Sequence, residues 1–480
     1  MWAPLHKDSG KGPEKQSRYL PSSPCVRIGS AGSCRPATAP TLPCKPLVCH
    51  HALLRVSKPL PCSGASFGIV ALLGGLEPYT SQAIQCPSSY NSGVELLPLS
   101  LLVVFALLLG SLIGSFLNVV IYRVPAGISV VWPRSRCPHC GHALSPLELV
   151  PIVSWVVQGG RCKNCKRPIP LRYPAVEGLT AVLFGVAALL RPVFPELVFI
   201  WAFIALLIAL AFIDIDTKTL PNSLNYGGIF LGLLGAGFLG FPQNSQAAID
   251  GGLMGAGLVA LFAGYGGWLY NRFKDGLREG PFGVHQVHLA AMVGALGGML
   301  GTVGGTWLGG LGIVVGLLNA SLNARTGKVF ALHDSLTLGL GALAPIVAWL
   351  LGLSPLESLR GMLVSAGGMA LAGMLYWWLR NPSDKVEPAP AEENLEGYVS
   401  VMGYGDVVLA GFLGVWLGFS SLMVAVFIAV FAGAIIGSIL RRFGGDNQIP
   451  FGPYLAIGGL VAFFYGKAIV QWYLGYIGLA

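Results

Sequence analysis

Residues Phe199–Asp216 read FIWAFIALLIALAFIDID. The run from Phe199 to Ile213 is wholly apolar and, with the residues before it, is long enough to cross a bilayer as a helix. Backbone groups inside lipid must be paired within their own segment, so a helix is expected here rather than an extended strand. The two aspartates that end the run are unusual, because carboxylates are costly in a membrane and those found there are commonly functional.

Comparable apolar stretches of about 17 to 25 residues recur from Leu96 onward, separated by short polar turns. The chain of 480 residues is 54% hydrophobic and 11% charged, whereas a soluble domain carries roughly 25% charged residues. We therefore expect an all-α polytopic integral membrane protein in the lipid bilayer, with about twelve transmembrane helices. They are expected to begin near Leu96, Pro174, Phe199, Ser223, Ala247, Gln286, Gly304, Ser335, Leu356, Val407, Ser421 and Phe451.

The positive charge lies in short loops beside these stretches. The loop 123–173 is rich in Arg and Lys and contains a single acidic residue, Glu148. Basic loops stay on the cytosolic side of a membrane, and counting crossings from this loop places Asp214 and Asp406 on that same side. The net charge of +9 is thus explained by topology, and no nucleic-acid partner is expected.

Four cysteines lie in the same loop as two Cys-x-x-Cys pairs, Cys137/Cys140 and Cys162/Cys165. Paired turns of this kind present four thiolates to a tetrahedral zinc ion, and the alternative, two disulfides, is disfavoured in a reducing cytosol. Four thiolates leave no open position for a substrate, so we expect a structural zinc site. The other cysteines lie within residues 1–95, a Pro- and Ser-rich stretch that we interpret as an over-extended gene start or a disordered tail.

A second acidic position stands in Met402-Gly-Tyr-Gly-Asp406, directly before another apolar stretch. Alone, Asp406 could be only a helix N-cap and Asp214 only an interfacial residue. Together, however, Asp214 followed by Pro221-Asn222 and the later Gly-Tyr-Gly-Asp resemble the paired motifs of type IV prepilin peptidases, the GxGD aspartyl proteases. Three further segments resemble that family in the family's order: residues 114–125, the cysteine loop with 171–180, and Pro450-Phe-Gly-Pro-Tyr-Leu-Ala456.

The resemblance implies an aspartic endopeptidase that cleaves the leader peptide of prepilins or pseudopilins at the cytosolic face of the inner membrane. It implies that Asp214 and Asp406 form the catalytic pair, with Asp216 as the substitute if Asp214 is misassigned. Two adjacent carboxylates cannot both ionise, so they can share a proton for general acid–base hydrolysis. Members with this cysteine loop often also N-methylate the new N-terminus with S-adenosylmethionine, for which we place no site.

Two departures from the family keep other functions open. Val408 stands where the family usually has Lys after the Gly-Asp, and the separation of Asp214 from Asp406 is longer than usual. An inactive peptidase-like protein is therefore one alternative. A proton-coupled membrane transporter is another, although it would not explain the cysteine loop.

An internal parallel repeat would explain the extra length. Asn222-Ser-Leu matches Asp334-Ser-Leu, Trp268-Leu-Tyr-Asn matches Trp378-Leu-Arg-Asn, and Val287–Ala290 matches Val407–Ala410. Under this alignment Asp406 falls on Gln286 and Asp214 falls on Thr326, so each copy keeps one aspartate and the halves would share one site. The expected divisions are 1–95 (extension), 96–122 (first helix), 123–173 (zinc loop), 174–303 (peptidase region with the first copy), 304–420 (second copy with GxGD) and 421–480 (final helices).

Overall fold

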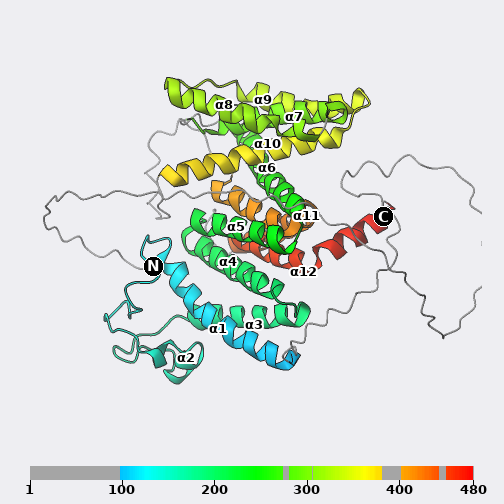
Figure 1. The fold of residues 1–480 in the computed structure, drawn as a ribbon. Coiled ribbons are helices and arrows are strands. Elements are labelled where there is room, and N and C mark those ends of the chain that lie inside the picture. The colour runs from blue at the N-terminus through cyan, green and yellow to red at the C-terminus, as the bar shows by residue number, and fades with distance from the viewer. Residues whose placement is uncertain (1–97, 274–280, 305, 381–401, 443–449, 479–480) are drawn as a thin grey trace, which may run out of the picture. The chain divides into compact units, whose positions relative to one another are not determined.

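The computed structural model describes residues 98–273, 281–304, 306–380, 402–442 and 450–478. Within these ranges the named elements are all helices, which confirms the all-α fold (Figure 1). Nine of them, in the described part of the chain, are long and apolar enough to cross a membrane. The polytopic class is therefore confirmed, and the count of twelve crossings is not. The expected extension, residues 1–95, lies outside the described residues.

The first group of helices comprises α1 (Leu99–Arg123), α3 (Arg172–Leu190) and α4 (Glu196–Thr217), which share one apolar core. Between α1 and α3 lies the basic loop, with a 3-10 turn η2 (Pro146–Leu149) and the short helix α2 (Val153–Val157). Trp201 of α4 stacks on Phe184 of α3 with ring centroids 5.5 Å apart. The Trp201 indole also donates to the Phe184 carbonyl at 3.1 Å, so its only polar group is satisfied inside the core.

A second core joins α4 to α5 (Asn222–Leu239), α11 (Tyr404–Arg442) and α12 (Gly452–Tyr476). A third lies among α6 (Ser245–Tyr270), α7 (Val284–Gly304), α10 (Pro355–Arg380) and the first part of α11. Beside α7 and α10 lie η3 (Thr306–Gly310), α8 (Leu311–Thr326) and α9 (Asp334–Leu350). Segments far apart in the sequence are thus packed together, because α11 lies along α6 and α10 lies along α7 (Figure 1).

Helix α11 changes direction at Gly418, whose φ of 71° and ψ of 162° are not helical. A Cβ added at Gly255 of α6 would meet both Leu422, after the break, and the carbonyl of Ala410, before it. Residues on the two sides of the break therefore lie at one level, and the chain reverses there. Glycine suits this position because residues with a side chain rarely adopt such a positive φ.

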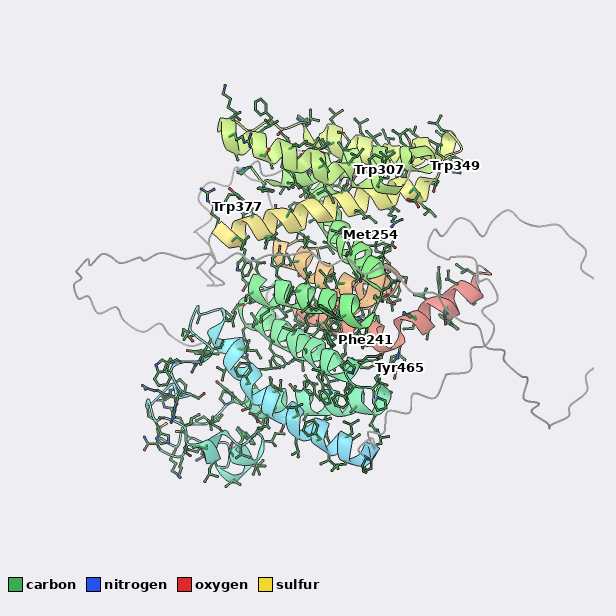
Figure 2. The ribbon with its side chains drawn as sticks, viewed as in Figure 1. Phe241, Met254, Trp307, Trp349, Trp377 and Tyr465 are labelled. Atoms are coloured by element: carbon green, nitrogen blue, oxygen red, sulfur yellow. The ribbon has the colours of Figure 1, made fainter. Side chains whose placement is uncertain are left out.

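The helices carry many exposed apolar side chains, as expected for surfaces that face lipid. Trp307 is 68% exposed and Trp349 is 69% exposed, and Figure 2 shows them, with Trp377, on the upper helices of that view. Tryptophan is favoured at the two membrane–water interfaces, where its ring is buried and its N–H stays near water. These exposed rings agree with a membrane-embedded bundle.

Candidate active site and metal centre

Asp214 lies in the last turn of α4 and is 5% exposed. Its Oδ2 accepts a hydrogen bond of 2.9 Å from the backbone N–H of Gly452, the first residue of α12. The amino end of a helix carries a partial positive charge, which favours a carboxylate there. A Cβ at position 452 would stand 2.6 Å from the same oxygen. Glycine is therefore what allows α12 to approach Asp214 this closely.

Asp406 lies in the first turn of α11 and its N–H donates to the Gly403 carbonyl at 3.2 Å. The neighbouring Gly405 packs on Leu220, and a Cβ at Gly405 would stand 2.8 Å from the Leu220 Cβ. Leu220 is the third residue after the end of α4. Gly405 of the Gly-Tyr-Gly-Asp motif thus lets the start of α11 pack against the segment that follows Asp214.

Both aspartates line one cavity of about 660 Å³. The remaining walls are mostly apolar and come from α6, the second part of α11 and the entry to α12, among them Leu258, Phe262, Val426 and Phe451. Lys218 also lines the cavity, in the left-handed conformation that ends α4. The structure therefore brings Asp214 and Asp406 together in a partly apolar space beside one cation.

Asp216 lies in a different environment from Asp214. Its carboxylate pairs with Arg172, at the start of α3, at 2.6 Å, and its side chain is 34% exposed. The Arg172 guanidinium also lies over the Phe212 ring, 5.7 Å from its centroid. Asp216 does not line the cavity and is engaged by a surface ion pair.

The four cysteines of the basic loop form one cluster, in which all Sγ atoms lie within 4.8 Å of one another. Each of the two Cys-x-x-Cys turns has the same pattern of backbone hydrogen bonds. Cys137 N donates to His142 O and Cys162 N donates to Arg167 O, both at 2.9 Å. At matching positions, Gly141 and Lys166 take positive φ values of 68° and 59°. The loop thus consists of two similar turns that face each other.

Hydrogen-bond donors favour the thiolate form at two of the four cysteines. The backbone N–H of His142 and the side-chain amide of Asn164 lower the pKa of Cys140 to about 6. Backbone N–H groups of Cys165 and Asn164 likewise lower the pKa of Cys162. The backbone N–H of Arg167 lowers the pKa of Cys165, but burial and the neighbouring thiols outweigh it and raise that pKa to about 11. The thiolate is the form of cysteine that binds metals. The four residues predicted as ligands are therefore brought together in a form that could hold an ion.

Buried polar contacts attach this loop to the membrane helices. The carboxylate of Glu177, on α3, accepts a 2.7 Å hydrogen bond from Ile152 N at the start of α2. The amide of Asn118, on α1, donates to the Tyr173 carbonyl at 3.1 Å. Glu177 and Asn118 are each 8% exposed. Glu177 therefore anchors the loop on α3, and Asn118 ties α1 to the start of α3, where Tyr173 lies.

Sequence reasoning missed three contributors to the site. The Gly452 amide could have been suspected, since the stretch Pro450–Ala456 was already singled out. Lys218 could have been suspected from its place four residues after Asp214. The wall supplied by α6 had no signal in the sequence, because Leu258 and Phe262 look like any residues of an apolar helix.

The fold is a bundle of membrane-spanning helices, and Asp214 and Asp406 line one cavity at the helix ends. These features define the class of polytopic membrane proteins with a pair of aspartates in one site. Comparison with known proteins then gives the family. The family model described as "Type IV leader peptidase family" matches residues 201–324 and 328–438. The model described as "Bacterial Peptidase A24 N-terminal domain" matches residues 108–190. The chain belongs to the type IV leader peptidase family.

Three relatives, each named prepilin leader peptidase/N-methyltransferase, show the extent of the similarity. That of Pseudomonas aeruginosa is 35% identical over 229 residues, 41% of this chain and 73% of the relative. That of Myxococcus xanthus is 41% identical over 231 residues, 47% of this chain and 66% of the relative. That of Aeromonas hydrophila is 27% identical over 417 residues, 80% of this chain and 96% of the relative. No solved structure matches the chain.

Proposed function

We propose that this membrane peptidase cleaves the leader peptide of prepilins or pseudopilins, with Asp214 and Asp406 as its catalytic pair. The observation that carries the proposal is the shared cavity, which both Asp214 and Asp406 line while Asp216 is paired elsewhere. The substrate class is taken from the names of the relatives. A cavity with apolar walls at the helix ends suits a substrate whose cut site adjoins a membrane segment.

In the proposed reaction, the two carboxylates share one proton. The ionised carboxylate takes a proton from a water molecule, whose oxygen attacks the scissile carbonyl carbon, while the protonated one donates to the carbonyl oxygen. The C–N bond then breaks as the leaving amine takes the proton that the first carboxylate gained from water. A hydroxyl group of the intermediate returns a proton to the second carboxylate as the new carboxylic acid forms. The Gly452 amide would hold the Asp214 carboxylate in place during these steps.

We further propose that Cys137, Cys140, Cys162 and Cys165 hold a structural zinc ion. A compact set of four thiols is the donor set that zinc prefers in structural sites. Through the Ile152–Glu177 hydrogen bond, an ordered loop would help to hold the first turns of α3. The names of the relatives include N-methyltransferase, so we also propose methylation of the new N-terminus with S-adenosylmethionine.

The proposed location is the inner membrane, with the cavity facing the cytosol. The basic loop and the C-terminal end of α4 would lie on one side, linked by the Arg172–Asp216 pair. By the positive-inside rule, that side is the cytosol. A leader that remains in the cytosol could then reach Asp214 and Asp406 without crossing the bilayer.

The test is leader cleavage of a co-expressed native pilin, read as a gel shift in membranes. Wild type is compared with Asp214→Ala, Asp406→Ala and the matched control Asp216→Ala. We expect the first two changes to abolish cleavage, because each removes one of the paired carboxylates. The control should keep cleavage, because exposed ion pairs contribute only about 0–1 kcal/mol to stability.

Cleavage that survives both cavity changes would show that the catalytic assignment is wrong. If wild type itself does not cleave a pilin that is its true partner, the inactive-protein alternative replaces the proposal. Mass spectrometry of the same product reports the second activity as one added methyl group at the new N-terminus.

A further inference from the structure

Three helices of the first repeat copy have counterparts in the second copy. The members of each pair have the same length or begin at matching residues. Helices α6 and α10 both have 26 residues, and the matching Trp268 and Trp378 lie near their ends. Helices α5 and α9 begin at the matching residues Asn222 and Asp334. The matching His-Gln and Gly-Asp stretches begin α7 and α11. The repeat expected from the sequence therefore falls on whole helices.

The first turns of the matching helices also share their hydrogen bonds. In α11, Asp406 N donates to Gly403 O at 3.2 Å, and in α7, Gln286 N donates to Gly283 O at 3.0 Å. In α5, Asn225 N donates to Pro221 O at 3.2 Å. In α9, Thr337 N donates to His333 O at 3.1 Å. Matching residues thus start matching helices with the same backbone geometry.

The packing between the helices is exchanged between the two halves. Gly414 of α11 lies against Gly251 of α6, so the helix that carries Asp406 packs on the first copy. Gly294 of α7 lies against Gly361 of α10 in the second copy. Gly251 matches Gly361, and Gly294 matches Gly414. The two contacts are therefore the same contact made twice, each time with the last helix of the other copy.

Helices α6 and α10 meet at the centre of this arrangement. Gly257 and Gly367 are matching residues and lie against each other, with Gly257 also facing the carbonyl of Leu363 and Gly367 that of Leu253. Leu253 matches Leu363. Gly257 of α6 thus meets Leu363 of α10, and the matching Gly367 of α10 meets the matching Leu253 of α6. Reciprocal contacts of this kind define a two-fold interface.

An ion pair at matching positions lies beside this centre. Asp250 of α6 binds Arg360 of α10 at 2.7 Å, with side chains 32% and 31% exposed. In a symmetric interface the two positions would hold identical residues and like charges would meet. When both copies lie in one chain, each position evolves separately. Equivalent positions can then carry opposite charges, as Asp250 and Arg360 do.

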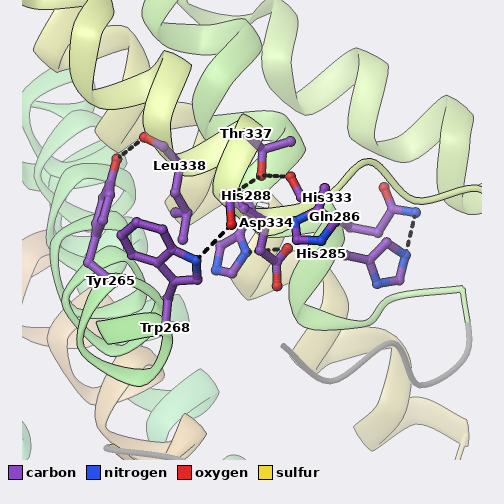
Figure 3. Close-up of polar contacts among 10 residues, drawn as sticks. Tyr265, Trp268, His285, Gln286, His288, His333, Asp334, Thr337 and Leu338 are labelled. Carbon is purple, nitrogen blue, oxygen red and sulfur yellow. Dashed lines mark hydrogen bonds and ion pairs between the residues drawn. The ribbon is translucent and has the colours of Figure 1, made fainter. Parts of the chain in front are cut away.

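A counterpart of the active site lies where α7 of the first copy meets α8 and α9 of the second copy, as Figure 3 shows in part. At the position of Asp406 stands Gln286, which is fully buried and whose amide lies 3.2 Å from His285 Nε2. The Gln286 carbonyl oxygen accepts from Asn319 of α8 at 3.3 Å. An amide cannot take up or release the proton that acid–base hydrolysis requires. Gln286 therefore cannot perform the acid–base step proposed for Asp406.

One expected match is not part of this cluster. Thr326, predicted to occupy the position of Asp214, is exposed at the end of α8, where its hydroxyl donates to Leu322 O at 2.8 Å. The residue of α8 that reaches Gln286 is Asn319. The correspondence is accordingly confined to α5 with α9, α6 with α10, and α7 with α11.

We propose that the chain is an internal duplication in which the two copies have exchanged one helix, giving one catalytic and one non-catalytic site. Helix α11 of the second copy completes the site that contains Asp214, and α7 of the first copy completes the counterpart around Gln286. The labels catalytic and non-catalytic rest on the function proposed above, whereas the exchange itself does not.

The exchange is tested in the full-length chain by pairs of introduced cysteines. Gly252→Cys with Val415→Cys joins α6 to α11, and a Cβ at Gly252 would stand 2.7 Å from the Val415 Cγ2. Ala295→Cys with Met362→Cys is the matching pair between α7 and α10. The matched controls use the same four positions in the unexchanged combinations, 252 with 295 and 362 with 415.

Membranes that contain each double-cysteine variant are oxidised. The variant is then cut at a protease site inserted between the two helices that carry its cysteines. Fragments that remain joined on a non-reducing gel report the disulfide, whose geometry requires Cβ atoms about 3.5–4.5 Å apart. We expect at least about tenfold more joined product from the exchanged pairs than from the controls, because α6 packs closely on α11 and α7 packs closely on α10.

Equal or greater joining in the unexchanged pairs would overturn the proposal. The α7–α10 pair replaces no glycine, so it decides the question if the substitution at Gly252 prevents folding. The readout is independent of proteolysis. If the exchanged cysteine pairs form disulfides but the protein cleaves no pilin, the helix exchange stands and the proposed function is rejected. If the unexchanged pairs form the disulfides and the protein does cleave the pilin, the function stands and the exchange is rejected.

Discussion

The position of Asp214 depends on one glycine. A methyl group at Gly452 would stand 2.6 Å from Asp214 Oδ2 and 3.1 Å from its Cγ, so the carboxylate or α12 must move. We predict that Gly452→Ala lowers leader cleavage about 100-fold, because small displacements of catalytic groups have effects of that size. The measurement is the initial rate of cleavage in membranes at equal amounts of folded protein.

Gly227→Ala, on α5, is the matched control for Gly452→Ala. Gly227 has open space at its Cβ position, and alanine is the better helix former by about 1 kcal/mol. Cleavage by this control should equal that of wild type. An unchanged rate in Gly452→Ala would mean that the amide of Gly452 does not position the catalytic carboxylate.

At this scale, the sequence predicted the side chains of the site and missed the backbone. Asp214 and Asp406 stand out because carboxylates are rare at the ends of apolar helices. The cysteines stand out because of their spacing. The Gly452 N–H could not be recognised in the same way, because every residue except proline carries such a donor and only packing selects one of them.

Among the elements, the two cysteine turns are predicted to depend on a metal ion. Cys162→Ser replaces a buried thiolate donor by a hydroxyl, and we expect bound zinc to fall from about one ion per chain to near zero. The loop should then be cut faster by added protease. Metal content of the purified protein and limited proteolysis are the two measurements.

Lys163→Ser is the matched control, since Lys163 is exposed and adjoins the same cysteine. It should retain the metal and the resistance to protease. Full zinc content in Cys162→Ser would contradict the assignment of this cysteine as a ligand.

Helix positions could be predicted better than helix packing. The start of α5 was expected near Ser223 and lies at Asn222, because Pro221 precedes it in an extended conformation (φ −61°, ψ 128°). By contrast, glycines spaced along a helix allow close approach by any neighbour. Gly251 could equally have packed on α7 as on α11, and the sequence alone does not distinguish these partners.

For the whole molecule, the positive-inside rule predicts which loops face the cytosol. Lys328, after α8, should lie on the cytosolic side, and Arg191, after α3, on the opposite side. In spheroplasts, Arg191→Cys should react with a membrane-impermeant maleimide. Lys328→Cys should react only after permeabilisation, with the parent chain as the reference for the native cysteines. The reverse pattern would place the proposed active site outside the cytosol.

The two halves also differ in a way that can be tested by transferring residues between them. His288 Nδ1 lies 2.9 Å from Asp334 Oδ1, and the two side chains are 0% and 1% exposed. The matching positions are Val408 on α11 and Asn222 on α5, near the proposed catalytic site, so no such pair stands there. If the halves are equivalent, the uncharged residues of one should fit the packing of the other.

We therefore predict that the double variant His288→Val/Asp334→Asn folds with stability close to wild type. Asp334→Asn and His288→Val alone should each be less stable, and His288→Val most of all. That variant leaves a buried carboxylate without its imidazole, a loss that costs about 3–5 kcal/mol. Replacing both members removes the buried charge as well, and uncharged substitutes for buried pairs are often neutral in stability. Thermal unfolding in detergent measures all three variants, and a double variant no more stable than His288→Val would show that the two positions are not equivalent to 408 and 222.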